Sequence, residues 1–170
     1  MPLNQDRPFP IRPRLKDVSL YIGMRGYFIT INTYNRKKYF IHEHIVFSLV
    51  TYLKQVAQQE KFDVVVFTYM PNHVHFVLLG KNESSNVCRF MKSYKQLTGY
   101  KFKQTFGSRL WATSFHDHVL RKEESIKSVG RYVLKNPVRA GLVKNICDYK
   151  FSGSFVYDLS ELAGLSDLKV

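Results

Sequence analysis

Residues 62–79 hold two apolar runs joined by a short turn, and this pattern constrains the fold more than any other part of the chain. The first run leads into the pair Pro71-Asn72, and the second run follows at once. A Pro-Asn pair between two runs of this kind is typical of a β-hairpin. The sequence therefore predicts a mostly buried sheet that contains this hairpin.

The second strand of the hairpin carries His73 and His75. Residues i and i+2 of a strand point to the same face, so the two imidazoles project side by side. Two neutral imidazoles held in this way are half of a divalent-metal site. A pair of hydrogen-bonded core histidines has the same spacing, and spacing alone leaves both interpretations open.

All six histidines occur in His-x-His pairs, and the two other pairs lie in different contexts. His42 and His44 open a helical pattern, where positions i and i+2 lie on different faces, so we expect solvated histidines there. His116 and His118 lie in a strand-like run over residues 114–120 and would share one face of a strand. A second metal site, a polar sheet face and a nucleic-acid contact all remain open for that pair.

The charge of the chain indicates its partner. Lys and Arg number 26 against 13 Asp and Glu, which gives a net charge of +13. Such an excess favours DNA, RNA or an anionic membrane surface. No apolar stretch reaches the length of a membrane span, and the N-terminus lacks the apolar core of a secretory signal. With only two cysteines and no disulfide framework, a reducing cytoplasm is the expected location.

A chain of 170 residues fits one domain. Apolar periodicity predicts these elements: a strand over 26–34, a helix over 42–59, the hairpin, a second helix capped by Ser85, a strand near 114–121, and a third helix over 123–134 that stops at Pro137. This order predicts an α+β, ferredoxin-like antiparallel sheet with helices packed mainly on one face. The open face of such a sheet can meet a nucleic-acid strand.

Two residues of the third helix could complete the chemistry of the histidine pair. Tyr132 and Asn136 are four residues apart and share one helix face. The amide oxygen of Asn136 could join a metal that polarises a phosphate, and Tyr132 could act as a phenolic nucleophile. From spacing alone, a core-edge tyrosine and a helix-terminal asparagine are the favoured interpretations.

Three stretches of the chain resemble one known family. They are Met-Pro-Asn-His-Val-His-Phe at 70–76, Ser-Phe-His-Asp-His-Val-Leu-Arg at 114–121, and Tyr-Val-Leu-Lys-Asn-Pro-Val-Arg-Ala-Gly-Leu-Val at 132–143. Together they are similar to the single-tyrosine HUH transposases of bacterial insertion sequences, and most of all to the REP-associated tyrosine transposases. The long third motif is much more specific than His-x-His alone.

The resemblance implies an HUH endonuclease fold over residues 19–155, after a basic lead-in over 1–18 and before a tail over 156–170. It assigns His73 and His75 as metal ligands, Asn136 as a third, amide ligand and Tyr132 as the nucleophile. The implied metal is Mg²⁺ or Mn²⁺, and the mixed nitrogen and oxygen ligands suit Mn²⁺ somewhat better.

The implied reaction is cleavage and rejoining of single-stranded DNA at hairpin sites, through a 5′-phosphotyrosine bond and a free 3′-hydroxyl. The protein would act as a monomer or homodimer in the cytoplasm, associated with the nucleoid and not with a membrane. Expected phosphate contacts are Lys92, Lys95, Lys101, Lys103 and Arg139. Expected base-stacking groups are Phe106, Trp111 or the N-terminal arginines.

Two rival functions share part of this pattern. A metal-dependent nuclease that activates water would use the histidine pair and would not need Tyr132. A non-catalytic nucleic-acid-binding module would bind without metal and cut nothing. The sequence leaves open the DNA sequence recognised, the mobility of the element, the chain that supplies the tyrosine, and the role of His116 and His118.

Overall fold

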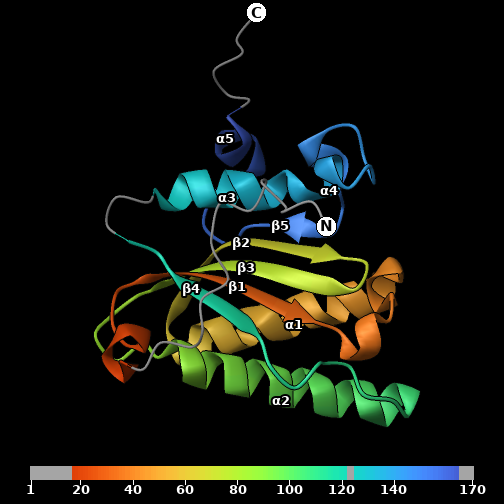
Figure 1. Ribbon diagram of the computed structural model, residues 1–170, viewed down its shortest axis with the longest axis horizontal. Coiled ribbons are helices and arrows are strands. Elements are labelled where there is room, and N and C mark those ends of the chain that lie inside the picture. Colours follow the sequence, from red (N-terminus) through yellow and green to blue (C-terminus); the bar gives the residue numbers. More distant parts are fainter. Residues whose placement is uncertain (1–16, 122–124, 165–170) are drawn as a thin grey trace, which may run out of the picture.

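A five-stranded antiparallel sheet forms the centre of the protein (Figure 1). The computed structural model describes residues 17–121 and 125–164. The strand order is β4-β1-β3-β2-β5, with bounds β1 Gly26–Asn32, β2 Phe62–Met70, β3 His73–Gly80, β4 His116–Val119 and β5 Ser152–Gly153. The predicted hairpin is β2–β3 and lies at the middle of the sheet, so the predicted antiparallel α+β architecture is confirmed.

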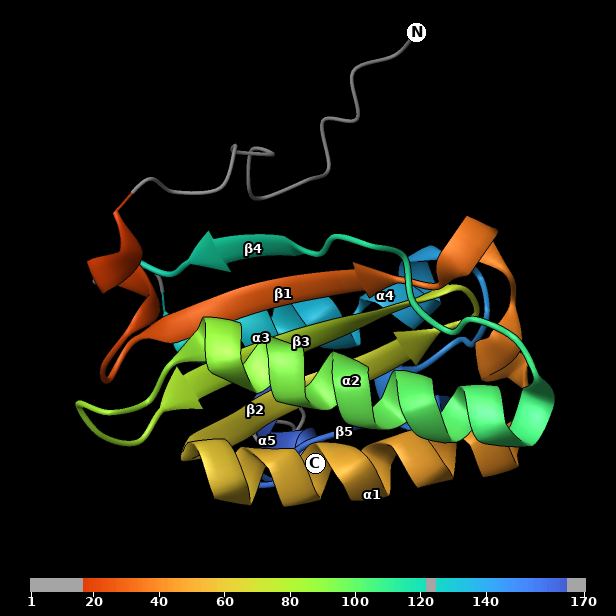
Figure 2. The same ribbon diagram turned by 90° about the horizontal axis from the view of Figure 1, so that it is seen from below.

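Two long helices, α1 (Glu43–Glu60) and α2 (Val87–Phe106), cover one face of the sheet (Figure 2). Three shorter helices lie on the other side, namely α3 (Ile126–Leu134), α4 (Asn136–Arg139) and α5 (Leu159–Ala163). Short 3₁₀ turns are η1 Val18–Tyr21, η2 Tyr34–Arg36, η3 Tyr39–Ile41 and η4 Ile146–Asp148. Over the described residues, every helix is too short or too polar to cross a lipid bilayer.

The main core lies between the sheet and the two long helices. Alternate strand residues point into it: Tyr27, Ile29 and Ile31 of β1, and Val74, Phe76 and Leu78 of β3. Each fully buried aliphatic or Phe side chain stabilises the fold by roughly 1.5–3 kcal/mol. The buried hydroxyls of Tyr69 and Tyr94 satisfy each other at 2.6 Å, which joins β2 to α2.

The second face is covered as well, which differs from the expectation of helices mainly on one face. Val65 and Val66 of β2 and Val77 of β3 are buried there against α3. A β-bulge between Val64 and Val66 lets both Val65 and Val66 contribute. Because the central strands are apolar on both faces, the sheet needs a cover on each side.

Two predicted helix starts shift in the structure. The N-cap of α2 is Asn86, whose side chain accepts from the backbone N–H of Arg89, whereas Ser85 is buried and its hydroxyl donates to the Lys61 carbonyl. Ser125 caps α3, and residues 122–124, where the third helix was expected to begin, lie outside the described residues. α3 ends at Leu134, ahead of Pro137, and Pro137 lies in the first turn of α4.

Two elements near the C-terminus were not predicted. β5 pairs Ser152 with Thr68 of β2. α5 lies within residues 156–170, which were assigned to a tail, and its Leu162 is buried against α3. The carbonyl of Leu162 also accepts from Arg131 Nε of α3 at 3.1 Å. The stretch after β5 therefore supports the helix that carries Tyr132.

Candidate active site

Under α3 the sheet changes from apolar to polar toward the end where β2 turns into β3. The strand register pairs His75 with Thr68 on β2 and with Thr30 on β1, and pairs Thr30 with His116 on β4. Directly paired residues of antiparallel strands share a face, so these side chains form a polar row. Ser152 of β5 extends it, because its hydroxyl lies 3.0 Å from that of Thr68.

His73 and His75 direct their Nε2 atoms at each other, 3.2 Å apart. Each Nδ1 atom has its own partner: Thr30 Oγ1 lies 2.8 Å from His75 Nδ1, and Asn72 Oδ1 lies 2.8 Å from His73 Nδ1. Phe28 stacks on the His75 ring at 5.5 Å. Hydrogen bonds at Nδ1 are what orient metal-binding histidines and leave the Nε2 lone pair available.

The spacing of the two Nε2 atoms fits a shared cation. Two lone pairs repel at 3.2 Å, so a proton on one nitrogen or a cation between them is required. Adjacent ligands of an octahedral ion, each roughly 2.1 Å from the metal, lie about 3 Å apart. Burial and, to a smaller extent, the positive charge of Arg36 lower the pKa of His73 to about 4. His73 is therefore neutral at pH 7, the form that binds metal.

The C-terminal end of α3 and the short helix α4 lie above this end of the sheet (Figure 1). Tyr132 belongs to α3, and Asn136 is the first residue of α4. The intervening Lys135 keeps right-handed helical angles, φ −77° and ψ −13°, and its carbonyl accepts from the Arg139 N–H. The helical path thus continues past Pro137, which only removes one donor. Tyr132 and Asn136 remain one helical turn apart, as the sequence predicted.

The donor set fits a divalent metal. Asn136 Nδ2 is a buried polar atom without a hydrogen-bond partner. The oxygen and nitrogen of an amide can exchange places by rotation, so either atom can occupy that buried position. Within residues 17–121 and 125–164, no three His, Cys, Asp or Glu side chains converge on one point, so a third protein ligand must be of another type. The amide oxygen of Asn136 is a ligand of that other type.

The predicted DNA-binding residues do not gather in one place. Arg139 lies over the Tyr132 ring, with its Cζ 4.9 Å from the ring centroid. The four lysines of the second helix lie on α2, across the sheet from the histidine pair: Lys92, Lys95, Lys101 and Lys103. The ammonium of Lys95 donates to the Ala112 and Thr113 carbonyls at 3.0 and 2.9 Å, so it anchors the loop after α2.

The prediction that Trp111 stacks on DNA bases is wrong. Trp111 is only 4% exposed, and its indole N–H donates to Thr98 Oγ1 at 2.8 Å. It packs in the main core, because the loop after α2 folds back on that helix. Phe106 is 44% exposed. The N-terminal arginines lie outside the described residues.

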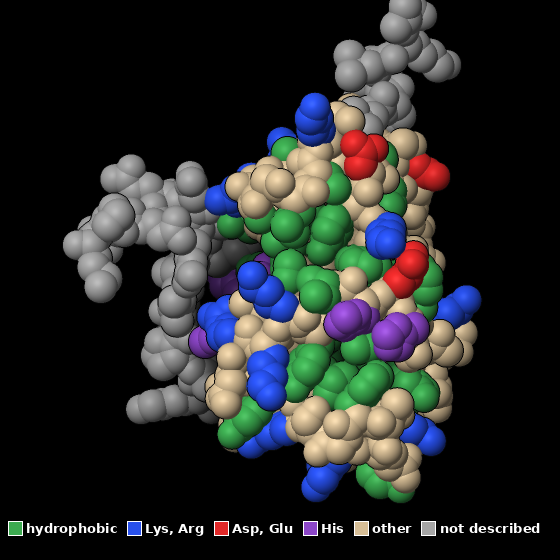
Figure 3. Space-filling model, turned by 90° about the vertical axis from the view of Figure 1, so that its right-hand side faces the viewer, with side chains coloured by type: hydrophobic (Ala, Val, Ile, Leu, Met, Phe, Trp, Pro, Cys, Tyr) green, Lys and Arg blue, Asp and Glu red, His purple; other side chains and the backbone are tan. Residues whose placement is uncertain are grey.

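The other two histidine pairs are placed as follows. His42 is the N-cap of α1, and both His42 and His44 are exposed, which confirms the solvated helix start. Figure 3 shows the end of the molecule to which the hairpin turn belongs, where histidine and basic side chains lie among apolar ones. His116 and His118 are in β4 and share a face with His75 through Thr30 and Phe28.

Four residues near the histidine pair were missed by the sequence reasoning: Thr30, Asn32, Asn72 and Arg36. Strand alternation over 26–32 places Thr30 and Asn32 on one face, and Asn72 directly precedes His73, so these signals were available. Asn32 pairs with His73, and its buried Oδ1 has no hydrogen-bond partner. Residues 35–38 are recognisable from the sequence as a basic turn, but the position of Arg36 near His73 depends on tertiary contacts.

Comparison with known proteins places this geometry in a family. Residues 25–136 match the family described as "Transposase IS200 like". A candidate REP-associated tyrosine transposase of Haemophilus influenzae is 26% identical over 161 residues, covering 85% of this chain and 90% of the relative. The REP-associated tyrosine transposase of Escherichia coli is 25% identical over 136 residues, covering 78% of each chain.

Solved structures share the fold. A REP-associated tyrosine transposase bound to a REP hairpin superposes with a TM-score of 0.65 at 22% identity, over 78% of each chain. A candidate transposase of Deinococcus radiodurans gives 0.51 at 18% identity, over 76% of this chain and 93% of that one. The resemblance drawn from the sequence motifs is confirmed, and this chain belongs to the IS200-like transposase family.

Proposed function

We propose that this protein cleaves and rejoins single-stranded DNA at hairpin sites through a phosphotyrosine bond to Tyr132. The observation that supports the proposal most is the convergence of two Nε2 atoms, each oriented through Nδ1, on the sheet face that α3 covers. Hairpin DNA is proposed because the related transposase structure is bound to a REP hairpin. His73, His75 and Asn136 would hold Mg²⁺ or Mn²⁺, which when bound supplies Lewis-acid polarisation of the scissile phosphate.

The residues of the chain have distinct tasks. The phenolic oxygen of Tyr132 forms a bond to phosphorus while the bond from phosphorus to the 3′-oxygen breaks. The phenol loses its proton and the departing 3′-oxygen gains one, so the products are a 5′-phosphotyrosine and a free 3′-hydroxyl. One phosphodiester replaces another, so no ATP is needed, and an incoming 3′-hydroxyl reverses the attack. Arg139 holds positive charge against the Tyr132 ring.

We also propose a cellular location, a catalytic domain and a set of phosphate contacts. The protein would work in the cytoplasm at the nucleoid, with residues 19–155 as the catalytic domain. Arg139, Lys92, Lys101 and Lys103 are proposed to contact phosphates. The ammonium of Lys95 donates to two carbonyls of the loop after α2. We therefore propose that Lys95 supports DNA binding by holding this loop in place.

The test is adduct formation. A hairpin oligonucleotide from the neighbourhood of the gene, with single-stranded flanks, is incubated with the protein and Mn²⁺ and resolved on a denaturing gel. We expect strand scission and a covalent protein–DNA band, both abolished by Tyr132→Phe with DNA binding retained. Tyr100→Phe is the matched control, because Tyr100 is 61% exposed on α2. Its adduct should equal that of the wild type.

The rival functions predict different gels. If the protein is a nuclease that activates water, the Tyr132→Phe variant will still cut the strand, and no variant will form a covalent adduct. A binding module would bind the oligonucleotide equally with and without EDTA, would cut nothing, and would be unaffected by His73→Ala.

A further inference from the structure

A basic turn follows β1 at the end of the sheet that carries the histidine pair. It comprises residues 35–38, Asn-Arg-Lys-Lys, and starts three residues after Asn32, the partner of His73 in the register. Arg36, Lys37 and Lys38 are all exposed. Among the described residues, none of the three forms an ion pair. Three successive cations without carboxylate partners are suited to an external anion.

The turn is held in an unusual backbone conformation. Asn35 has φ 52° and ψ 28°, and Arg36 has φ 53°. Asparagine tolerates this left-handed region, but arginine adopts it only when surrounding contacts enforce it. Those contacts come from Thr33, whose hydroxyl lies 2.7 Å from the Lys37 carbonyl and 2.9 Å from the Asn72 carbonyl.

Thr33 therefore ties the basic turn to the hairpin turn that carries the candidate metal ligands. The Thr33 N–H also donates to the Asn72 carbonyl at 3.0 Å, and Asn72 orients His73. The turn that carries Arg36 is thus held against the turn that leads into His73.

A cationic turn next to a cation site is unfavourable by itself. Arg36 would repel a divalent metal at the histidine pair unless an anion lay between them. A phosphodiester of the bound strand carries that negative charge and accepts the paired N–H donors of a guanidinium. A phosphate between the metal and the guanidinium would therefore offset their repulsion.

An aromatic group borders the same turn. Tyr34, which immediately precedes it, is 38% exposed. The guanidinium of Arg109 lies 4.9 Å from the centre of its ring, and Arg109 is itself held by hydrogen bonds to the Trp111 carbonyl and the Thr113 hydroxyl. An exposed ring beside phosphate-binding cations is the combination that holds single-stranded DNA.

We propose that the basic turn is a binding site for the DNA backbone, with Arg36 contacting a phosphodiester at or next to the one that is cut. The site orients the strand across the histidine pair. This inference rests on the proposed function, since it assumes that the bound polyanion is the strand that Tyr132 attacks.

The test measures binding without cleavage. The same hairpin oligonucleotide is titrated in EDTA with Arg36→Gln at several salt concentrations. We expect about tenfold weaker binding and a salt-dependence slope reduced by roughly 0.7, the value for one lost phosphate contact on a single strand. Arg36→Lys should recover part of the affinity, and an unchanged thermal unfolding midpoint shows that Arg36→Gln is folded.

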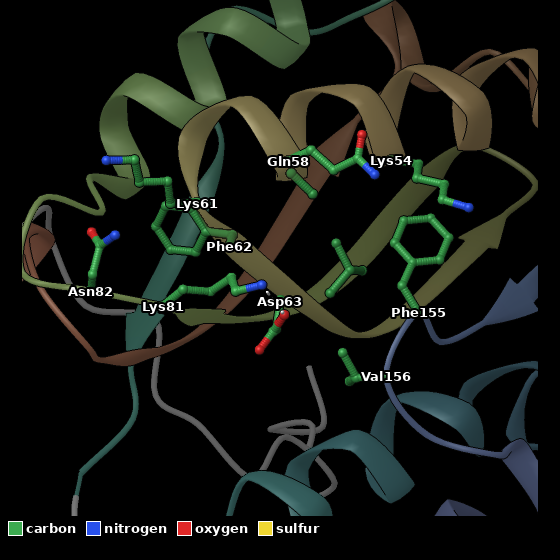
Figure 4. A pocket seen from close by; sticks show the side chains of 11 residues that line it. Lys54, Gln58, Lys61, Phe62, Asp63, Lys81, Asn82, Phe155 and Val156 are labelled. Atoms are coloured by element: carbon green, nitrogen blue, oxygen red, sulfur yellow. Dashed lines mark ion pairs between the residues drawn. The ribbon is translucent and has the colours of Figure 1, made fainter.

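A remote lysine provides the control. Lys54 lines a hollow toward the opposite end of the hairpin, where it lies beside Phe155 and across from Lys61 and Lys81 (Figure 4). Lys54→Gln removes the same charge far from the histidine pair and should leave affinity and slope nearly unchanged. Equal losses for Lys54→Gln and Arg36→Gln would mean that only overall charge matters, which overturns the proposal.

Neutral phosphates locate the contact. A methylphosphonate placed in turn at each position around the cleavage site should weaken binding to the wild type at one or two positions, and Arg36→Gln should be insensitive at those positions. Identical profiles for both proteins would overturn the proposal. Adduct formation by the wild type is scored separately, so an active enzyme with no Arg36 contact is distinguished from a protein that binds DNA and never forms the adduct.

Discussion

The hydroxyl of Thr30 determines how His75 presents its Nε2 atom. It lies 2.8 Å from Nδ1, on the neighbouring strand and in direct register. Replacing it by a group of the same shape without hydrogen-bonding capacity removes the orientation and keeps the packing. We therefore expect Thr30→Val to weaken Mn²⁺ binding roughly 10- to 100-fold, as loss of such a partner does in other metal sites.

The measurement is calorimetric titration of the protein with Mn²⁺ in the absence of DNA. Thr30→Ser keeps the hydroxyl and should bind Mn²⁺ within a factor of about two of the wild type, since the hydrogen bond is retained. Equal affinities for Thr30→Val and the wild type would show that the imidazole is oriented by Phe28 stacking and strand geometry alone.

At the scale of single residues, features that follow from local periodicity could be predicted, whereas contacts between distant residues could not. That His73 and His75 share a face follows from strand alternation, and the structure confirms it. The partners at their Nδ1 atoms could not be predicted in the same way, because Thr30 lies 45 positions from His75 in the sequence. Which residue meets which depends on strand register, and register is set by tertiary packing. The ligand and nucleophile roles themselves stay predictions.

Among the elements, α3 is the one whose position matters most, because it carries Tyr132. Its close approach to the sheet is made possible by Gly130. A Cβ atom at that position would lie 3.1 Å from Val66 Cγ2. We expect Gly130→Ala to push α3 outward by a few tenths of an ångström and to lower the rate of adduct formation roughly tenfold, since about 1 Å of misplacement can cost 10²-fold.

Stability should change little in the same variant. Alanine gains about 1 kcal/mol of helix propensity over glycine, and overpacking costs about 1–3 kcal/mol, so the net loss is roughly 1 kcal/mol. Single-turnover adduct formation and urea unfolding separate the two effects. Ser128→Ala, at an exposed position of α3, is the control and should leave the rate unchanged. A fall in adduct rate for both variants would point to general disturbance of the helix.

The elements were largely predictable in order and in kind, and less so in placement. The predicted order of strands, helices and the hairpin was confirmed, because each long element has its own apolar periodicity. The cover on the second face was missed, although the unbroken run Val64-Val65-Val66-Phe67 is typical of a strand buried on both sides. β5 has two residues and α5 has five, so neither carries enough periodicity to be detected.

For the whole molecule, net charge indicated the kind of partner but not the surface that meets it. Among the described residues, basic side chains lie on more than one surface of the sheet. The α2 lysines lie on the side of the main core, and the basic turn lies at the end with the histidine pair. The net charge of a sequence adds the charges of all surfaces together. Only the folded structure shows which basic residues lie on which surface.

The fold also bears on whether the site is built from one chain or two. α3 packs on the sheet of its own chain, and Val129, Val133 and Leu134 are buried against the strands that carry the histidines. Tyr132 would have to leave with this apolar helix to reach a partner, which would expose the second cluster to water. We therefore expect the tyrosine to act on the histidine pair of its own chain.

Mixing two inactive variants tests this arrangement. Tyr132→Phe keeps the histidine pair, and His73→Ala keeps the tyrosine. If the site is contained in one chain, no mixture of the two forms an adduct, even after co-expression allows hybrid dimers. If the tyrosine comes from a partner, a hybrid contains one complete site, and an adduct appears on the His73→Ala chain. Sedimentation of the wild type with and without hairpin DNA shows whether the protein is a monomer or a dimer under the conditions of the mixing experiment.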